Sequence, residues 1–386
     1  MATEAPKSIV KTPSKRSPPL PVFRPSYGEE ELRLLSEVLK SGWVGQGPKV
    51  KAFEEKMAAY IGVKHAVAVN SCTAALHLTM MALDLQGSEV ITTPITFIST
   101  NHAILYVGGI PVFCDVERDT MNLDADRVES LITPKTRALV CVHYGGHACN
   151  MDMLLKIAAR YKLKLIEDVA HGCGGEWKGR KLGSIGDVAC FSFHAVKNLA
   201  TGDGGMIATN DTALYERFNR LRWMGITRDT WQRGAVQYAW QYDVVELGYK
   251  YQMCDIIAAI GLAQFDKLEA GNARRRKIAE IYNAAFSKLR WLECPVQRDY
   301  ATVHARHNYV IHTDHRDALN RHLQELGVST GVHYIPNNQY AIYRQCRGPT
   351  PVAESEWKRL LTLPLFPGMT DEDVDFVVSA IRSFHP

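Results

Sequence analysis

The sequence predicts an α/β protein in which a largely parallel sheet is covered by helices on both faces. Short runs rich in Val, Ile and other apolar residues recur between residues 65 and 210, namely “HAVAVN”, “EVITTP”, “RALVCVHY”, “LKLIEDV”, “DVACFSF” and “GMIATN”. Most of them are separated by segments with helical spacing, such as “MDMLLKIAARY”. Alternation of this kind favours a parallel sheet, because parallel neighbours are usually joined by a crossover helix.

The first 22 residues are predicted to form a flexible tail. The stretch “MATEAPKSIVKTPSKRSPPLP” is rich in Pro, Lys and Ser, and it lacks the apolar central segment of a signal peptide or membrane anchor. No later stretch approaches the roughly 18 uninterrupted apolar residues of a membrane-spanning helix. We therefore expect no membrane insertion.

Residues 23–265 are predicted to form a large domain that contains the sheet. Two helices are expected at its start, over “YGEEELRLLSEVLKSG” and “VKAFEEKMAAYIG”, because apolar residues recur every three or four positions and a glycine ends each pattern. The first helix places Leu32, Leu35 and Leu39 on one face. Both are expected to be surface helices.

Residues 266–386 are predicted to form a linking helix and a smaller C-terminal α/β domain. “HNYVIHT” and “VSTGVHY” are predicted strands on either side of a helix over “ALNRHLQELG”. The last element, “TDEDVDFVVSAIRSF”, begins with Thr370 and Asp373, which resemble a capping box. Its apolar residues then recur on one face, so we expect a terminal helix docked on the domain.

Composition narrows the class of protein. With 386 residues, 46% of them hydrophobic and 22% charged, the chain can bury a large core and form more than one domain. The formal net charge of +4 is small and the basic residues are dispersed, which argues against a nucleic-acid partner. The nine cysteines are odd in number and contain no CxxC pair, so we expect reduced thiols in a cytoplasmic protein.

Candidate site residues follow the predicted strands, because ligands of open α/β sheets bind beyond the carboxyl ends of the strands. After “HAVAVN” come Ser71, Cys72 and Thr73, at the start of a helix whose free N–H groups and positive dipole end attract an anion such as phosphate. Ordinary N-capping by Ser71 or Thr73 explains this stretch equally well on its own.

Two further strands are followed by groups that can react. Asp168 and His171 come after “LKLIE”; a carboxylate there could cap a turn, but a buried acid needs a partner, such as a protonated heterocyclic nitrogen. Lys197 follows “DVACFSF”, where its amine can attack a carbonyl if burial or neighbours keep part of it unprotonated. Ser192, near the end of that strand, can add a hydroxyl to a phosphate site.

Phe97 completes the set. It ends “ITTPITF”, where its ring could cover a planar ligand, although an aromatic side chain at a strand end more often belongs to the core. Phosphate donors, an acid for a ring nitrogen, an aromatic cover and a lysine nucleophile together describe a site for pyridoxal 5'-phosphate.

The chain resembles the DegT/StrS family of PLP-dependent sugar aminotransferases, which have the type I aspartate aminotransferase fold. The resemblance covers roughly residues 20–384. It is carried by the segments “SGWVGQGPKVKAFE”, “NSCTAALHL”, “TTPITFIST”, “IEDVAHGCGGEWKGRKLGSIGDVACFSFHAVKNLATGDGG”, “GYKYQMCDIIAAIGL” and “GVHY”.

The resemblance implies a role for each residue that would lie near the cofactor ring. Lys197 would form a Schiff base with the cofactor and later act as a base, and Asp168 would pair with the pyridinium nitrogen. His171 would lie near the phenolic oxygen or the ring, and Phe97 would stack on the ring. The catalytic residues implied are therefore Lys197, Asp168 and His171.

The phosphate group would be held by Cys72, Thr73 and Ser192, with the backbone N–H as the contributing group of Cys72. The resemblance further implies a homodimer with shared active sites, in which Lys250 of “GYKYQM” reaches the phosphate bound by the neighbouring subunit. The alternative for Lys250 is a surface ion pair with Glu246, and such pairs contribute little stability.

The implied reaction moves an amino group, usually from glutamate, onto a nucleotide-linked keto-sugar to give a 3- or 4-amino deoxysugar. Trp43 of “SGWVGQG”, together with His333 and Tyr334 of “GVHY”, would lie near the sugar. No metal is implied. His143, His147 and His307 follow or precede predicted strands, and lone histidines there are more often hydrogen-bonded structural residues.

Three other functions are kept as alternatives. A regulator that binds the cofactor without turnover would share the fold, because fold does not fix function. A PLP-dependent sugar dehydratase is a second alternative, although such relatives carry His where this chain has Lys197. A nucleotide-binding dehydrogenase is the third, but no GxGxxG follows an early strand.

Overall fold

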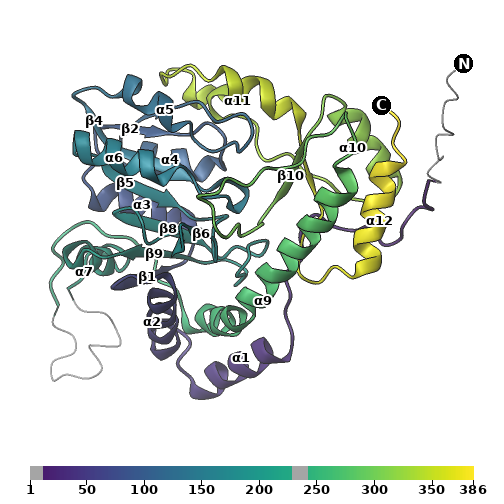
Figure 1. Cartoon of the computed structure of the whole chain (residues 1–386). Helices are drawn as coiled ribbons and strands as arrows, with labels where there is room; N and C mark the ends of the chain where they lie inside the picture. Colours follow the sequence, from purple (N-terminus) through teal and green to yellow (C-terminus); the bar gives the residue numbers. More distant parts are fainter. Residues whose placement is uncertain (1–11, 228–241) are drawn as a thin grey trace, which may run out of the picture.

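A computed structural model describes residues 12–227 and 242–386 of the chain (Figure 1). Its central layer is a seven-stranded sheet with the order β1-β9-β8-β5-β4-β2-β3. The strands are β1 (His65–Val69), β2 (Glu89–Thr92), β3 (Ile110–Phe113), β4 (Thr136–Val142), β5 (Lys164–Asp168), β8 (Val188–Ser192) and β9 (Gly205–Thr209). Only β9 runs against its neighbours, so the predicted mostly parallel sheet is confirmed. Strand β3 was not among the predicted strands.

Both faces of the sheet are buried, as expected for a parallel sheet. Alternate residues of β1 show this: Val67 and Val69 pack with helices on one face, whereas Ala66 and Ala68 pack with helices on the other. The first face is covered by α3 (Cys72–Ala82), α4 (Ile98–Tyr106) and α7 (Thr212–Leu221). The second is covered by α2 (Pro48–Ile61), α6 (Met151–Tyr161) and the first half of α9 (Asp255–Phe286).

The first predicted helix forms, but its leucine face is exposed. In α1 (Glu29–Ser41) the buried residues are Glu31 and Val38, whereas Leu32 and Leu39 are 61% and 62% exposed. Glu31 is held by polar partners on α9, because its carboxylate accepts hydrogen bonds from Gln264 and Lys267. The apolar period therefore predicted the helix, and a polar contact decided which face packs on the protein.

Helix α9 runs without a break through the predicted domain boundary at residue 265 and leads into the smaller unit (Figure 1). That unit contains an antiparallel pair, β10 (Tyr309–His312) and β11 (Leu360–Leu363), and the helices α10 (Arg316–Glu325) and α12 (Asp371–Arg382). These elements and the second half of α9 share a separate hydrophobic core.

The predicted strand over “VSTGVHY” is wrong. Within it, Val328 makes a single bridge to Leu20 and Gly331 a single bridge to Thr362, whereas the strand that pairs with β10 is β11. The segment leaves the edge of β11 after one bridge because it turns toward the large domain, where Tyr334 contacts His171. The capping box of α12 is confirmed, since Thr370 and Asp373 each bind the other's backbone N–H.

Part of the predicted tail is docked on the small unit. Leu20 is 2% exposed, its N–H donates to Gly327 O at 2.8 Å, and the N–H of Leu365 donates to Val22 O at 3.1 Å. Residues 16–22 therefore differ from the expected flexible tail, because Leu20 fills the core of the small unit. Residues 1–11 lie outside the described part of the chain.

The remaining elements are short. They are α5 (Ala125–Val128), α11 (Pro351–Glu356), the hairpin β6 (Glu176–Trp177) and β7 (Arg180–Lys181), and the 3-10 turns Glu129–Leu131, Tyr144–Gly146, Asn337–Gln339, Ala341–Tyr343 and Trp357–Arg359. Across residues 12–227 and 242–386, no helix combines the length and the apolar composition needed to cross a membrane.

Candidate active site

A pocket of about 380 Å³ lies where several strands of the sheet end and the helices α3 and α4 begin. It brings together most of the residues that the sequence predicts for the site, namely Cys72, Thr73, Phe97, Asp168, His171, Ser192, Lys197, His333 and Tyr334. The chain supplies them from segments that are far apart in the sequence, so the sheet topology is what assembles the pocket.

The N-terminus of α3 presents free donors to this pocket. Ser71 caps the helix by accepting the N–H of Ala74 at 3.0 Å, so the capping interpretation of Ser71 is confirmed. Among the described residues, the N–H groups of Cys72 and Thr73 donate to no backbone or side-chain acceptor. Two unsatisfied N–H groups at the positive end of a helix can bind an anion. The cap formed by Ser71 is therefore compatible with phosphate binding by Cys72 and Thr73.

Close approach of two backbones shapes the same end of the pocket. A Cβ on Gly205 of β9 would meet the carbonyl of Ser71 and the nitrogen of Cys72 at 2.4–2.6 Å, so only glycine fits there. Gly205 pairs with Ser192 of β8, which lines the pocket. The hydroxyl of Ser192 is thereby placed at the edge of the sheet where α3 begins.

Asp168 ends β5 and is buried. Its Oδ1 accepts the N–H of Ala170 at 3.0 Å, and its Oδ2 accepts the hydroxyl of Thr100 at 2.8 Å. Burial raises the pKa of Asp168 above its ordinary value, while these two hydrogen bonds and the charge of Lys197 act in the opposite direction. Sequence reasoning missed Thr100; its signal is a hydroxyl in the first turn of α4, three residues after Phe97.

Lys197 lies in the irregular segment that follows β8, with its N–H bonded to His194 O at 2.8 Å. Burial lowers the pKa of Lys197 from its ordinary value of 10.5 to about 8, against the opposing effects of Cys72 and Asp168. Part of the amine is therefore unprotonated near neutral pH, which a nucleophilic lysine requires.

His171 links the wall of the pocket to the small unit. Its Nδ1 accepts the N–H of Gly145 at 3.3 Å, so in the neutral ring the proton lies on Nε2, which is 3.0 Å from the hydroxyl oxygen of Tyr334. Burial lowers the pKa of His171 well below its ordinary value, so the ring is neutral. Tyr334 accepts from His171, and its own hydroxyl proton remains available to a ligand.

Phe97 is not a core residue. It is 58% exposed and precedes α4, and its ring centroid lies 6.4 Å from that of Tyr334. The ring is therefore free to cover a ligand in the pocket.

The three histidines that the sequence assigns to structural roles are buried and hydrogen-bonded. His143 Nε2 lies 3.0 Å from Glu167, His147 Nδ1 lies 2.7 Å from the carbonyl of Ala148, and His307 Nδ1 lies 3.1 Å from the side chain of Asn198. His307 also stacks on Phe23, with parallel rings 5.3 Å apart. These contacts support the structural interpretation of all three histidines.

Trp43 and Lys250 lie outside this pocket. They line a separate hollow of about 310 Å³ together with Trp223, and Lys250 Nζ lies 3.4 Å from the centroid of the Trp223 ring. Glu246 is bound by Arg217 and Arg220, and no carboxylate of the described chain pairs with Lys250. The alternative ion pair between Lys250 and Glu246 is therefore absent.

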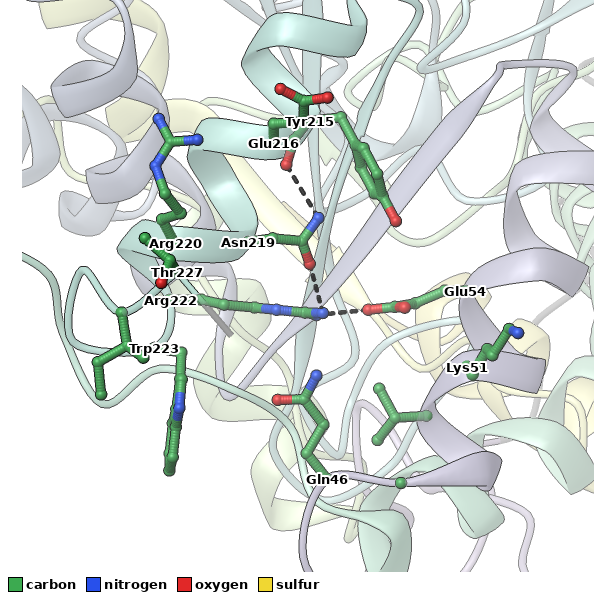
Figure 2. A pocket seen from close by; sticks show the side chains of 13 residues that line it. Gln46, Lys51, Glu54, Tyr215, Glu216, Asn219, Arg220, Arg222, Trp223 and Thr227 are labelled. Atoms are coloured by element: carbon green, nitrogen blue, oxygen red, sulfur yellow. Dashed lines mark hydrogen bonds and ion pairs between the residues drawn. The ribbon is translucent and has the colours of Figure 1, made fainter. Parts of the chain in front are cut away.

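A larger hollow, of about 730 Å³, lies between α2 and α7. Figure 2 shows that Arg222 extends between Glu54 and Asn219 in its centre, and Arg222 Nη2 donates to Asn219 Oδ1 at 2.6 Å. None of the predicted site residues lines it. Volume alone therefore does not select the candidate site, because the predicted site residues line the smaller pocket instead.

Comparisons with known proteins point to one enzyme family. The model of the DegT/DnrJ/EryC1/StrS aminotransferase family matches residues 25–382. The chain is 44% identical to the uncharacterized protein MJ1066 of Methanocaldococcus jannaschii over 94% of this chain and 97% of that protein. It is 42% identical to the spore coat polysaccharide biosynthesis protein SpsC of Bacillus subtilis over 95% of this chain and 97% of that protein.

A solved structure with a similar fold is also an aminotransferase by its name. The putative sugar aminotransferase Spr1654 of Streptococcus pneumoniae in its PMP-form superposes with a TM-score of 0.89 at 29% identity, covering 94% of this chain and 98% of that chain. The same neighbour has also been solved in a PLP-form.

Proposed function

The chain belongs to the DegT/DnrJ/EryC1/StrS aminotransferase family, and from this premise we propose that it transfers an amino group from glutamate to a nucleotide-linked keto-sugar, with pyridoxal 5'-phosphate as cofactor. The product is an amino sugar. The observation that carries the proposal is that one pocket holds the partly unprotonated amine of Lys197, the buried carboxylate of Asp168 and the open N-terminus of α3.

The residues of the pocket fit the cofactor. The free N–H groups of Cys72 and Thr73 and the hydroxyl of Ser192 match the oxygens of a phosphate. The close approach at Gly205 keeps these groups together. Asp168 has accepted two hydrogen bonds, and its carboxylate has capacity for a third donor, such as a protonated ring nitrogen.

The chemistry divides between the cofactor and the chain. When bound, pyridoxal phosphate supplies an electron sink that allows a proton to leave the α-carbon of the amino donor. Lys197 would be the covalent attachment point and, once released, the base that takes this proton. Asp168 would hold a proton on the ring nitrogen, and Phe97 would exclude water from one side of the site.

The wall of the pocket that His333 and Tyr334 line suits a sugar. Burial keeps the ring of His333 neutral by lowering its pKa to about 4. The hydroxyls of Tyr334 and of Ser99 in the first turn of α4 are uncharged hydrogen-bonding groups, which match sugar hydroxyls. We propose that His333 and Tyr334 contact the sugar from this wall, and that Trp43, which lines the separate hollow beside Lys250, is a third sugar-contacting residue.

A homodimer with shared active sites is part of the proposal. Lys250 is exposed and lies outside the pocket of its own chain, which is compatible with a role in the partner's site. Nearby, Val244, Val245 and Leu247 are 63%, 58% and 77% exposed. An apolar patch of this kind supports an interface with a second copy. We also propose a cytoplasmic location, supported by nine free thiols within the described chain.

The test is a panel of nucleotide-linked keto-sugars offered to the purified protein with glutamate and pyridoxal phosphate. Mass spectrometry should show a product in which C=O is replaced by CH–NH₂, with 2-oxoglutarate formed in equal amount. An unchanged absorbance of the bound cofactor after addition of glutamate, together with no sugar product, would favour a regulator. Loss of oxygen without gain of nitrogen would favour a dehydratase.

A further inference from the structure

Two buried threonine hydroxyls form a chain that ends on Asp168. Thr96 Oγ1 lies 2.8 Å from Thr100 Oγ1, and Thr100 Oγ1 lies 2.8 Å from Asp168 Oδ2. Thr96 and Thr100 are 3% and 1% exposed. An ionised carboxylate only accepts hydrogen bonds, so Thr100 donates to Asp168 and Thr96 donates to Thr100. The direction of both bonds follows from the charge of Asp168.

These two hydroxyls matter because Asp168 is only 3% exposed. Apart from Thr100, the donor to Asp168 within the described chain is the N–H of Ala170, which binds the other carboxylate oxygen. Hydrogen bonds to a charged group are worth more than neutral ones, and leaving a buried charge short of a donor is costly. Thr100 thus supplies one of the two hydrogen bonds that favour the ionised form of the carboxylate and fix its plane.

Thr100 also connects Asp168 to the cover of the pocket. It lies in the first turn of α4, and its N–H donates to Phe97 O at 3.2 Å. One helical turn therefore carries the aromatic ring that lines the pocket and the hydroxyl that holds the acid. Both Thr96 and Thr100 line the same pocket.

We propose that Thr100 is a positioning residue of the aminotransferase reaction, which holds Asp168 ionised and oriented toward the cofactor's ring nitrogen, with Thr96 strengthening the bond from Thr100. The inference rests on the proposed function, because the ring nitrogen belongs to pyridoxal phosphate. A merely structural role would make Thr100 a buried side chain whose loss lowers stability and leaves the ring nitrogen unaffected.

The experiment compares Thr100→Val, which keeps the shape and removes the hydroxyl, with Thr100→Ser, which keeps the hydroxyl. Holoproteins are loaded with ¹⁵N-labelled pyridoxal phosphate, and the nitrogen chemical shift reports whether the ring nitrogen is protonated. The control is Thr209→Val, because Thr209 is also buried and its hydroxyl donates to the carbonyl of Asp187. Asp187 binds the N–H of Leu165 near the start of β5, whereas Asp168 lies at the end of that strand, so this variant leaves Asp168 untouched.

We expect the wild type, Thr100→Ser and Thr209→Val to show a protonated ring nitrogen. Thr100→Val should move the shift toward the neutral form and lower kcat by about 10- to 100-fold, the effect of losing one hydrogen bond to a charged group. Thr96→Val should act in the same direction by a smaller factor, because it removes only the donor behind Thr100.

A Thr100→Val protein with the nitrogen shift and kcat of the wild type overturns the proposal. If circular dichroism shows that Thr100→Val is unfolded, Thr100→Ala and Thr96→Val decide by the same two measurements, and wild-type values in both overturn it. A wild-type protein that binds no pyridoxal phosphate would instead contradict the proposed function itself, which separates the two failures.

Discussion

The hydroxyl oxygen of Tyr334 lies 3.0 Å from Nε2 of His171, across the boundary between the small and the large unit. The backbone of Gly145 fixes the tautomer of His171, and the hydroxyl of Tyr144 binds the carbonyl of His333, next to Tyr334. The position of Tyr334 is therefore set by two residues of the large unit, and its hydroxyl proton is left for a ligand in the pocket.

Removing the Tyr334 hydroxyl should weaken binding of the sugar more than the chemical step. For Tyr334→Phe we expect KM for the keto-sugar to rise about 5- to 10-fold, which corresponds to one neutral hydrogen bond. Steady-state kinetics measure it. Tyr282→Phe is the matched control, because the Tyr282 hydroxyl donates to Pro364 O inside the small unit. Equal KM values for both variants would remove Tyr334 from the sugar site.

Lys197→Ala should abolish transamination and the visible absorbance that the bound cofactor owes to its attachment. We expect kcat to fall at least about 10³-fold, because both the covalent attachment and the base are lost. Lys164→Ala, which alters an exposed lysine paired with Asp187, is the control. Full activity in Lys197→Ala would show that another group performs its role.

Asp168→Asn should bind the cofactor and be nearly inert. An amide cannot keep the ring nitrogen protonated as a carboxylate does, so we expect kcat to fall at least about 100-fold. Absorbance after gel filtration measures retention of the cofactor, and single-turnover kinetics with glutamate measure the chemical step. Turnover at the wild-type rate would exclude Asp168 from the mechanism.

The shared-site proposal predicts complementation between two inactive variants. Mixing Lys197→Ala and Lys250→Ala subunits should restore up to about one quarter of wild-type activity after random reassortment, since each heterodimer has one site with both defects and one with none. Lys51→Ala, at an exposed lysine, replaces Lys250→Ala in the control mixture. An active monomer in sedimentation, or mixtures that stay inactive after reassortment, would contradict the shared site.

The lowered pKa of Lys197 predicts a pH dependence of apoprotein stability. The pKa of this amine is 10.5 in the unfolded chain and about 8 in the folded chain. Between these values the unfolded state binds more protons, so stability rises with pH through this window. Below pH 8 the wild type should therefore have a smaller free energy of unfolding than Lys197→Met. The two free energies should become similar by pH 10.5. Urea unfolding at several pH values measures the difference, and a constant difference would contradict the buried amine.

The sequence by itself determined the sheet and the edge at which the site lies. Apolar runs separated by helical spacing predicted most of the strands, and the residues after them, from Cys72 to Lys197, meet in one pocket. The capping box of Thr370 and Asp373 was also readable. These features are local: side-chain period, capping and the common direction of parallel strands act within a few residues or follow from one topology.

Only the tertiary structure decided which distant groups touch. Thr100 and Asp168 are 68 positions apart and Tyr334 and His171 are 163 apart, so neither contact leaves a periodic signal in the chain. The burial of Leu20 in the core of the small unit also leaves no periodic signal, because Leu20 belongs to a stretch with the composition of a flexible tail. Such contacts depend on how whole elements pack, since burial selects partners by shape and by the need to satisfy buried polar groups, and a sequence pattern records neither.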